Sequence, residues 1–118
     1  VLVHNPDFIL SEESKNADLI LAGNTHGGQI RLPFVGPIAL LPSRLPRSFD
    51  EGLFVEVRHS ERNAVERRIP FEKVRDPSSP SAPQDDAVRR LFITSGISES
   101  GPRARLFNPP EIVLLEFN

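Results

Sequence analysis

The sequence of 118 residues contains no cysteine, methionine, tryptophan or tyrosine. Without cysteine, the chain has neither a disulfide framework nor a thiolate metal site, so any bound metal ion needs histidine, carboxylate or amide ligands. Without tryptophan and tyrosine, it lacks most of the aromatic surfaces on which nucleic-acid bases stack. The formal net charge is −2, so no excess of basic side chains attracts a phosphate backbone. We therefore expect no nucleic-acid partner.

Long hydrophobic runs are absent as well. No stretch is long and apolar enough to span a bilayer, and no signal peptide is visible. The chain begins without methionine, inside the apolar run VLVH, so we expect it to be the later part of a longer protein. Cytoplasmic and peripherally membrane-associated locations of the complete protein both stay open.

The residues that are present predict a strand-rich α/β fold. The first two apolar runs are separated by a polar stretch that opens with the turn signal Asn5-Pro6 and has room for a short helix. This order of strand, crossover and strand predicts a parallel β-α-β unit, for which the crossover is just long enough. Five apolar runs in all predict strands, at residues 1–4, 18–23, 52–57, 90–96 and 111–117.

The remaining segments are predicted to be loops. Residues 28–49 are apolar but interrupted by prolines, which indicates an ordered loop rather than a helix. We interpret its apolar part, residues 32–42, as a cover for the sheet, with a lipid-accepting groove as the alternative. Residues from about 59 to 88 are polar and include the run PSSPSAPQDD, which predicts an exposed, flexible insertion.

Two of the three histidines follow predicted parallel strands. His4 ends the first run, and His26 lies just past the end of the second. Because parallel strands end at one edge of the sheet, where α/β proteins bind ligands, both side chains are expected at that edge. Imidazole is a good ligand for zinc, iron or manganese, and Gly27 and Gly28 would allow a close approach of the backbone. The alternative is an ordinary turn with hydrogen-bonded histidines.

Three segments carry a resemblance to a known family. The segment GNTHGGQIRLP (residues 23–33) resembles the last signature of the calcineurin-like metallophosphoesterases, normally Gly-His-x-His. The segment HNPDF (residues 4–8) is similar to the preceding signature, and RLFNPPEIVLLEF (residues 105–117) is similar to the closing segment of one subgroup. That subgroup includes bacterial phosphohydrolases related to UDP-2,3-diacylglucosamine diphosphatase. The resemblance implies part of a β-sandwich flanked by helices, with two divalent metal ions (manganese, zinc or iron) at the strand ends.

The resemblance also implies roles for individual residues. His4 corresponds to a ligand of the second metal ion and His26 to a ligand of the first. Asn24 stands where the family has another histidine ligand, and Ser95 stands where the subgroup commonly has a basic residue. Arg31 is expected to bind substrate phosphate, because guanidinium suits it. Four further arginines share this chemistry but are expected to be mostly solvated: Arg44, Arg47, Arg103 and Arg105.

The family signatures that supply most metal ligands do not occur in this sequence. The resemblance therefore implies that residues 1–118 are the carboxyl-terminal portion of the phosphoesterase domain, with the amino-terminal half as a missing partner. The implied function is hydrolysis of a phosphoester or pyrophosphate by a metal-activated hydroxide. The substrate would be a phosphorylated small molecule or a lipid-linked phosphate, and no residue here is assigned as catalytic. The alternative is a non-catalytic binding module in which Asn24 marks a lost second metal site.

Overall fold

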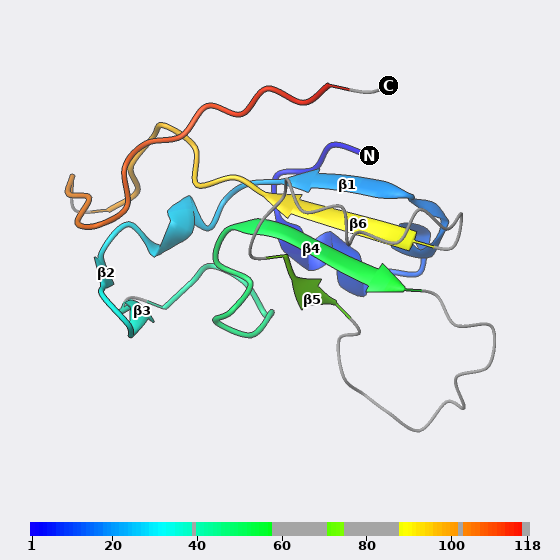
Figure 1. The fold of residues 1–118 in the computed structure, drawn as a ribbon, viewed down its shortest axis with the longest axis horizontal. Helices are drawn as coiled ribbons and strands as arrows, with labels where there is room; N and C mark the ends of the chain where they lie inside the picture. The colour runs from blue at the N-terminus through cyan, green and yellow to red at the C-terminus, as the bar shows by residue number, and fades with distance from the viewer. Residues whose placement is uncertain (39, 58–70, 75–87, 102, 117–118) are drawn as a thin grey trace.

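A four-stranded sheet in the order β1-β6-β4-β5 forms the centre of the chain (Figure 1). A computed structural model describes residues 1–38, 40–57, 71–74, 88–101 and 103–116. The sheet consists of β1 (Leu19–Ala22), β4 (Gly52–Val57), β5 (Glu72–Lys73) and β6 (Val88–Ile93). Within the described residues, the helices are all short and of the 3-10 type, and none is long and apolar enough to cross a membrane. The predicted class, mixed and rich in strands and loops, is confirmed.

The predicted parallel pairing at the start of the chain is confirmed, although residues 1–4 form an isolated bridge and not a strand. Leu2 forms a parallel bridge with Leu21, and the Val3 N–H donates to the Leu21 carbonyl over 2.9 Å. The crossover between these strands consists of two 3-10 helices, η1 (Pro6–Leu10) and η2 (Glu13–Asn16). The Asn5 side chain caps η1 by accepting from the Asp7 N–H at 2.8 Å, as expected of a residue that favours N-caps.

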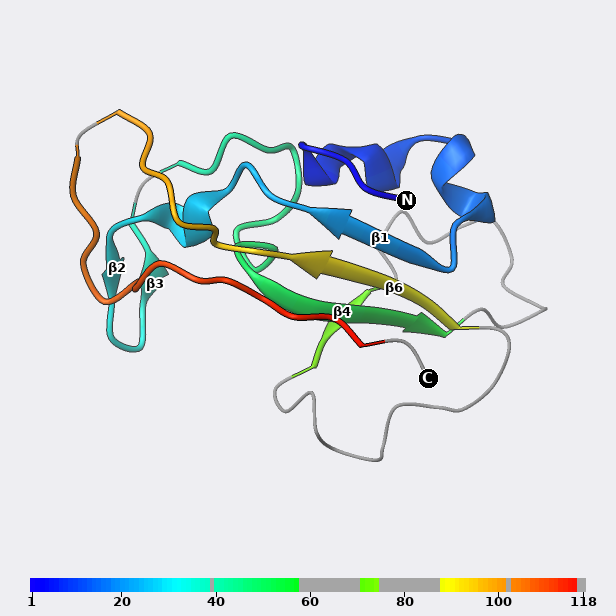
Figure 2. The same cartoon turned by 90° about the horizontal axis from the view of Figure 1, so that it is seen from above.

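Alternation along the strands places the core on one face of the sheet. Leu91 of β6 lies in register with Ile20 of β1 and Phe54 of β4, and all three side chains are fully buried. The helices η1 and η2 lie on this side of the sheet (Figure 2) and contribute Ile9 to the core. The ring of Phe49 stacks on Phe54 with centroids 4.5 Å apart, so the loop before β4 closes the core.

The predicted strand at residues 111–117 is not formed in residues 111–116, the part that is described. A strand needs a partner for its ladder of backbone hydrogen bonds, whereas this segment has one such bond, from the Glu111 N–H to the Gly96 carbonyl over 2.9 Å. Ile112 and Leu114 are 88% and 84% exposed. The segment runs in extended form past the face of the sheet opposite η1 and η2 (Figure 2).

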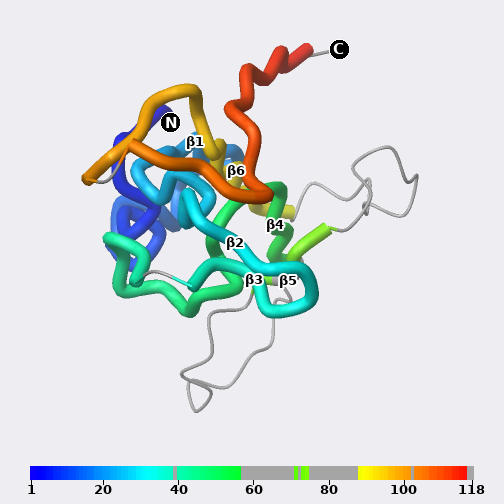
Figure 3. Tube along the Cα trace, turned by 90° about the vertical axis from the view of Figure 1, so that its left-hand side faces the viewer, coloured from blue at the N-terminus to red at the C-terminus, as the bar shows by residue number. Residues whose placement is uncertain are grey.

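The loop predicted to cover the sheet instead projects from it. Residues 31–37 form a small hairpin of β2 (Arg31–Leu32) and β3 (Gly36–Pro37), which lies beyond the carboxyl ends of β1 and β6 (Figure 3). At its tip Phe34 is fully exposed and Val35 is 70% exposed. The expectation of a cover is therefore wrong for the hairpin, although Leu45, further along the loop, does enter the core.

Most of the insertion predicted at about residues 59–88 lies outside the described residues. Its described part, residues 71–74, is ordered by pairing with β4, in the register Phe54–Lys73. Phe71 is buried in the core, and the Arg89 guanidinium lies 5.0 Å from the centre of its ring. The prediction of an exposed segment is wrong for Phe71, which packs into the core, whereas Lys73 is exposed at the edge of the sheet.

Candidate metal-binding edge

The candidate site lies at the carboxyl ends of β1 and β6, where the chain leaves β1 and forms the short helix η3 (His26–Gly28) (Figure 1). The Gly23 N–H donates to the His4 carbonyl over 3.1 Å, so the ends of the first two runs lie side by side, as the sequence predicts. The backbone then turns sharply, with left-handed φ angles of 69° at Asn24 and 51° at His26. Asparagine and histidine are among the side chains that adopt this region most readily.

The imidazole of His26 is oriented by a single main-chain contact. Its Nδ1 lies 3.2 Å from the carbonyl oxygen of Ser98, in the loop after β6. A carbonyl oxygen only accepts hydrogen bonds, so Nδ1 carries the proton in this arrangement. The lone pair of a neutral ring is then on Nε2, which is the atom left for a ligand. This is how a metal-binding histidine is usually held.

His4 lies beside this loop, but its side chain is exposed and makes no hydrogen bond within the described part of the chain. The structure therefore brings the backbones of residues 4 and 23–26 together. The described residues contain no group of three or more histidine, cysteine, aspartate or glutamate side chains that would hold a metal ion. The imidazole and amide donors suit a divalent ion, but they make up only part of a coordination sphere.

Asn24 is held through its amide nitrogen. The side-chain Nδ2 donates to the carbonyl of Pro42 over 3.2 Å. Asn24 therefore does not cap the turn by accepting a bond from a nearby backbone amide, as asparagine often does. Its amide oxygen, the atom with which an asparagine would bind a metal ion, forms no hydrogen bond within the described residues.

Arg31 stabilises the turn that contains Gly27. Its Nη1 donates to the Gly27 carbonyl at 3.0 Å and to the Asp50 carboxylate at 2.6 Å, and it forms an ion pair with the Glu51 carboxylate at 3.1 Å. The Lys73 ammonium completes the cluster, 2.8 Å from the other oxygen of Asp50. Phosphate binding by Arg31 stays a prediction, and the structure adds that this side chain fixes the position of Gly27.

The pKa values of the two carboxylates of this cluster are shifted in opposite directions. Burial alone would raise the pKa of Asp50, but the Lys73 hydrogen bond, the Glu51 amide and the charges of Lys73 and Arg31 together lower it. Burial raises the pKa of Glu51, and the nearby carboxylates of Asp50 and Glu111 act in the same direction. Asp50 is therefore the anion that the two cations stabilise.

Asn108 packs closely against the turn at His26 and Gly27. The buried Asn108 donates from Nδ2 to the His26 carbonyl over 2.6 Å. A Cβ atom built on Gly27 would lie 2.4 Å from Glu51 and 2.8 Å from Asn108, and φ at Gly27 is +58°. A side chain at residue 27 would have to displace the Glu51 and Asn108 side chains, which gives a reason for the first of the two glycines after His26.

Sequence reasoning missed several residues of this edge. Asp50 and Asn108 were not identified, because neither stands in a pattern that sets it apart from a loop residue. Ser95, which stands where the subgroup commonly has a basic residue and so puts one phosphate contact in doubt, is 3% exposed, and its hydroxyl donates to Glu111 over 3.3 Å. Arg105, which was expected to be solvated, binds the carbonyls of Ser95 and Gly96.

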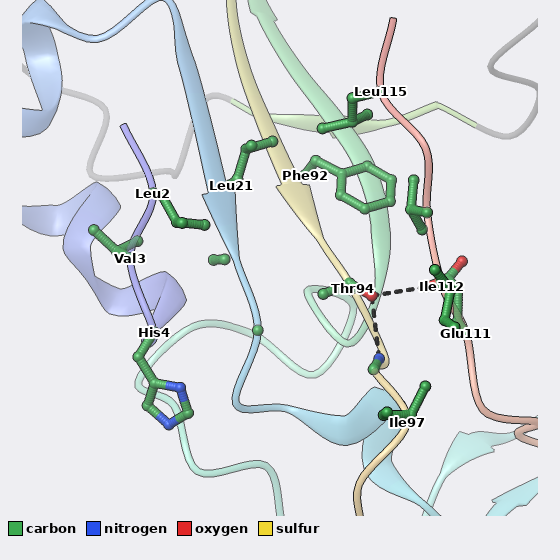
Figure 4. A pocket seen from close by; sticks show the side chains of 14 residues that line it. Leu2, Val3, His4, Leu21, Phe92, Thr94, Ile97, Glu111, Ile112 and Leu115 are labelled. Atoms are coloured by element: carbon green, nitrogen blue, oxygen red, sulfur yellow. Dashed lines mark hydrogen bonds between the residues drawn. The ribbon is translucent and has the colours of Figure 1, made fainter.

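An apolar groove of about 470 Å³ runs from the candidate site along the sheet. Figure 4 shows His4 at one end of it, with Leu21 and Phe92 on the floor and Leu115 from the carboxyl-terminal segment on the far side. The Glu111 carboxylate accepts from the Thr94 hydroxyl over 3.1 Å and holds this segment beside the groove.

Comparisons with known proteins agree with the motif analysis. No family model matches the chain, and no solved structure matches it significantly. The chain is 29% identical over 115 residues, 98% of its length, to the uncharacterized metallophosphoesterase Cj0846 of Campylobacter jejuni. Over 54 residues, 46% of its length, it is 44% identical to the uncharacterized metallophosphoesterase YkuE of Bacillus subtilis. Over 36 residues, 30% of its length, it is 53% identical to phosphodiesterase YaeI of Escherichia coli.

These matches cover 21%, 18% and 13% of the three relatives, so the chain spans about a fifth of their length or less. They confirm the family resemblance, and the three relatives share a name for the hydrolysis of phosphoesters. The chain is thus similar to parts of two proteins named metallophosphoesterase and of one named phosphodiesterase.

Proposed function

We propose that this chain supplies the carboxyl-terminal part of a metal-dependent phosphoesterase domain. His26 would bind one divalent ion through Nε2, and His4 and Asn24 would bind a second. The other ligands would come from residues outside this chain, since the described part contains no complete metal-binding group. When bound, such ions supply an activated water and neutralise the charge that develops on the phosphoryl oxygens.

The observation that carries this proposal is the orientation of His26. The Ser98 carbonyl takes up Nδ1, and the Asn108 side chain holds the main chain of the same residue. The ring is therefore fixed at the sheet edge with its Nε2 lone pair available, next to an asparagine whose amide oxygen is also available. The names of the curated relatives add support for phosphoester hydrolysis.

The chain's own residues would contribute binding and orientation. Arg31, which is paired with Asp50, donates to the Gly27 carbonyl. This contact would keep the shape of the turn when metal ions and a substrate phosphate bind beside it. The Arg31 side chain is 19% exposed, and we propose that its guanidinium binds a substrate phosphate. The substrate would be a phosphorylated small molecule or a lipid-linked phosphate.

The test compares His26→Ala with Arg103→Ala in the complete gene product that contains this chain. Arg103 is an exposed arginine in the loop after β6 and serves as the control. We expect His26→Ala to lose about one metal equivalent by elemental analysis. It should also lose at least about 100-fold in hydrolysis of a chromogenic phosphodiester, because even residues behind the ligands change metal affinity by about 10- to 100-fold. An unchanged metal content in His26→Ala would contradict the proposal.

A non-catalytic binding module is the second candidate. Asn24 favours it, since an amide oxygen is a weaker ligand than imidazole for zinc-like ions. The same experiment separates the two, because a module would show no metal-dependent hydrolysis in the unsubstituted protein either.

A further inference from the structure

We propose that Arg105 is a positioning residue that fixes the tautomer and orientation of the His26 imidazole through the main-chain carbonyl of Ser98. The effect on metal binding rests on the proposed function, in which His26 is a ligand. The effect on the tautomer of His26 does not.

Arg105 gathers the carbonyl groups of the loop that follows β6. Its Nη2 donates to the carbonyls of Ser95 at 3.0 Å, Gly96 at 3.2 Å and Ser98 at 2.5 Å. Its Nη1 donates to the Asn108 carbonyl over 3.4 Å. One planar guanidinium with five N–H donors thus binds four carbonyls of this irregular segment. A lysine ammonium, with all its donors on one nitrogen, could not reach the same carbonyls in this geometry.

The Nε atom of Arg105 shows that these carbonyls determine where the guanidinium lies. Nε is buried and finds no acceptor among the described residues. A buried donor without a partner costs about 1–3 kcal/mol. The side chain keeps this unfavourable position of Nε because Nη1 and Nη2 bind the loop carbonyls. The loop carbonyls and the guanidinium therefore hold each other in one arrangement.

The Ser98 carbonyl is the link between Arg105 and the candidate site. It accepts from Arg105 Nη2 and lies 3.2 Å from Nδ1 of His26. The residues around it are exposed, with Ile97 at 66%, so packing does not hold this carbonyl in place. The side-chain oxygen of Gln29 also binds this loop, by accepting from the Ser100 N–H, but this bond does not involve the Ser98 carbonyl.

The expected consequence is a change of tautomer when Arg105 is removed. In water, the neutral imidazole ring favours the Nε2–H form. The Ser98 carbonyl imposes the opposite form, since only a protonated Nδ1 donates to it. Without Arg105 the Ser98 carbonyl is free to move, and His26 should return to the Nε2–H form. In that form the lone pair is on Nδ1, which faces the loop, and Nε2 cannot bind a metal ion.

The experiment records the imidazole ¹⁵N resonances of His26 in this 118-residue chain, above the ordinary histidine pKa of about 6.5. We expect the Nδ1–H form in the unsubstituted chain and in the control Arg103→Ala, and the Nε2–H form in Arg105→Ala. Arg105→Lys should behave like Arg105→Ala, and it provides the same comparison if the alanine variant does not fold. A folded variant that keeps the Nδ1–H form would overturn the inference and leave Arg105 with a purely structural role.

A second measurement separates this inference from the proposed function. In the complete gene product, Arg105→Ala should weaken zinc binding by about 10- to 100-fold, the range known for residues that orient metal-binding histidines. A changed tautomer with unchanged zinc affinity would support the positioning role and contradict His26 as a ligand. Loss of zinc in His26→Ala, together with an unchanged tautomer in Arg105→Ala, would support the proposed function and overturn the role of Arg105.

Discussion

Asn24 is the residue at which this chain departs from the signature that it otherwise resembles. Its left-handed backbone, with φ at 69°, suits asparagine and histidine alike, so the turn itself does not explain the exchange. Its Nδ2 donates to the Pro42 carbonyl, and its amide oxygen forms no hydrogen bond with the part of the chain that the structure describes. In the proposed function this oxygen would bind the second metal ion, and it is a weaker ligand than imidazole for zinc-like ions.

We predict that Asn24→His raises the metal content of the complete gene product from about one towards two equivalents and increases phosphodiester hydrolysis. Imidazole would fill the position of the weak ligand, whereas Asn16→His, an exposed asparagine at the end of η2, should change neither quantity. Elemental analysis and the hydrolysis rate are measured together. If the parent protein already holds two ions and the variant changes neither quantity, Asn24 is an adequate ligand and the site is not weakened.

Asp50 is the residue on which the support of the turn depends. Its side chain is 5% exposed and bonds both Arg31 and Lys73. We predict that Asp50→Asn lowers the free energy of unfolding at pH 7 by about 3 kcal/mol, since breaking one side of a buried ion pair leaves uncompensated charge. Chemical denaturation measures this, with Glu12→Gln as control, because the exposed pair of Glu12 with Lys15 should contribute less than about 1 kcal/mol.

The pH dependence of this effect follows from the direction of the shift. The pKa of Asp50 is lowered in the folded chain, so the folded state binds its proton less readily than the unfolded state does. The stability from the ionised group is present above the ordinary value of 3.8 and is lost as the pH falls through the lower folded value. The difference between the parent and Asp50→Asn should therefore shrink below about pH 4. A difference that stays constant down to pH 2 would contradict this account.

At the scale of elements, β5 shows how a short segment becomes part of the sheet. It contributes two residues to the ladder with β4, which alone is a marginal element. Phe71, next to it, is buried in the core beneath the Arg89 guanidinium. The stabilisation of β5 is therefore expected to come mainly from the aromatic side chain and not from its backbone hydrogen bonds.

We predict that Phe71→Ala destabilises the chain by about 3–4 kcal/mol, the usual cost of removing a buried aromatic ring. Phe34→Ala, the same exchange at the fully exposed tip of the β2–β3 hairpin, should change stability by less than about 0.5 kcal/mol. Urea unfolding of both variants gives the comparison. Equal effects would show that residue 71 does not lie in the core.

At the scale of the whole molecule, the candidate metal ligands in this chain are too few to form a catalytic centre by themselves. The described residues bring His4, Asn24 and His26 to one edge, but they form no complete metal-binding group. The relatives that the chain resembles are about five or more times longer than the part it matches. Activity is accordingly expected only in a longer protein.

We predict that the isolated 118-residue chain hydrolyses a chromogenic phosphodiester no faster than the background rate with added manganese or zinc. The reason is that two coordination spheres require more ligands than it provides. The complete gene product, assayed under the same conditions, is the positive control. Metal-dependent turnover by the isolated chain at ordinary enzymatic rates, about 1 per second or more, would contradict the proposal of a partial site.

The sequence by itself determined the local elements with strong patterns. Buried apolar runs predicted the strands at residues 18–23, 52–57 and 90–96, and the shared edge of parallel strands predicted that His4 and the turn before His26 would meet. These predictions rely on continuous apolar runs and on chain direction, which a single sequence contains.

Tertiary structure alone decided the contacts between segments far apart in the chain. The apolar run at residues 111–117 has a strand-like sequence but lacks a partner strand over its described part, and Phe71 lies in a polar stretch but reaches the core. Asp50, Asn108 and Arg105 look like ordinary loop residues until folding places them behind Gly27 and His26. Their roles depend on hydrogen bonds across long sequence separations, and no local pattern specifies which residues will meet there.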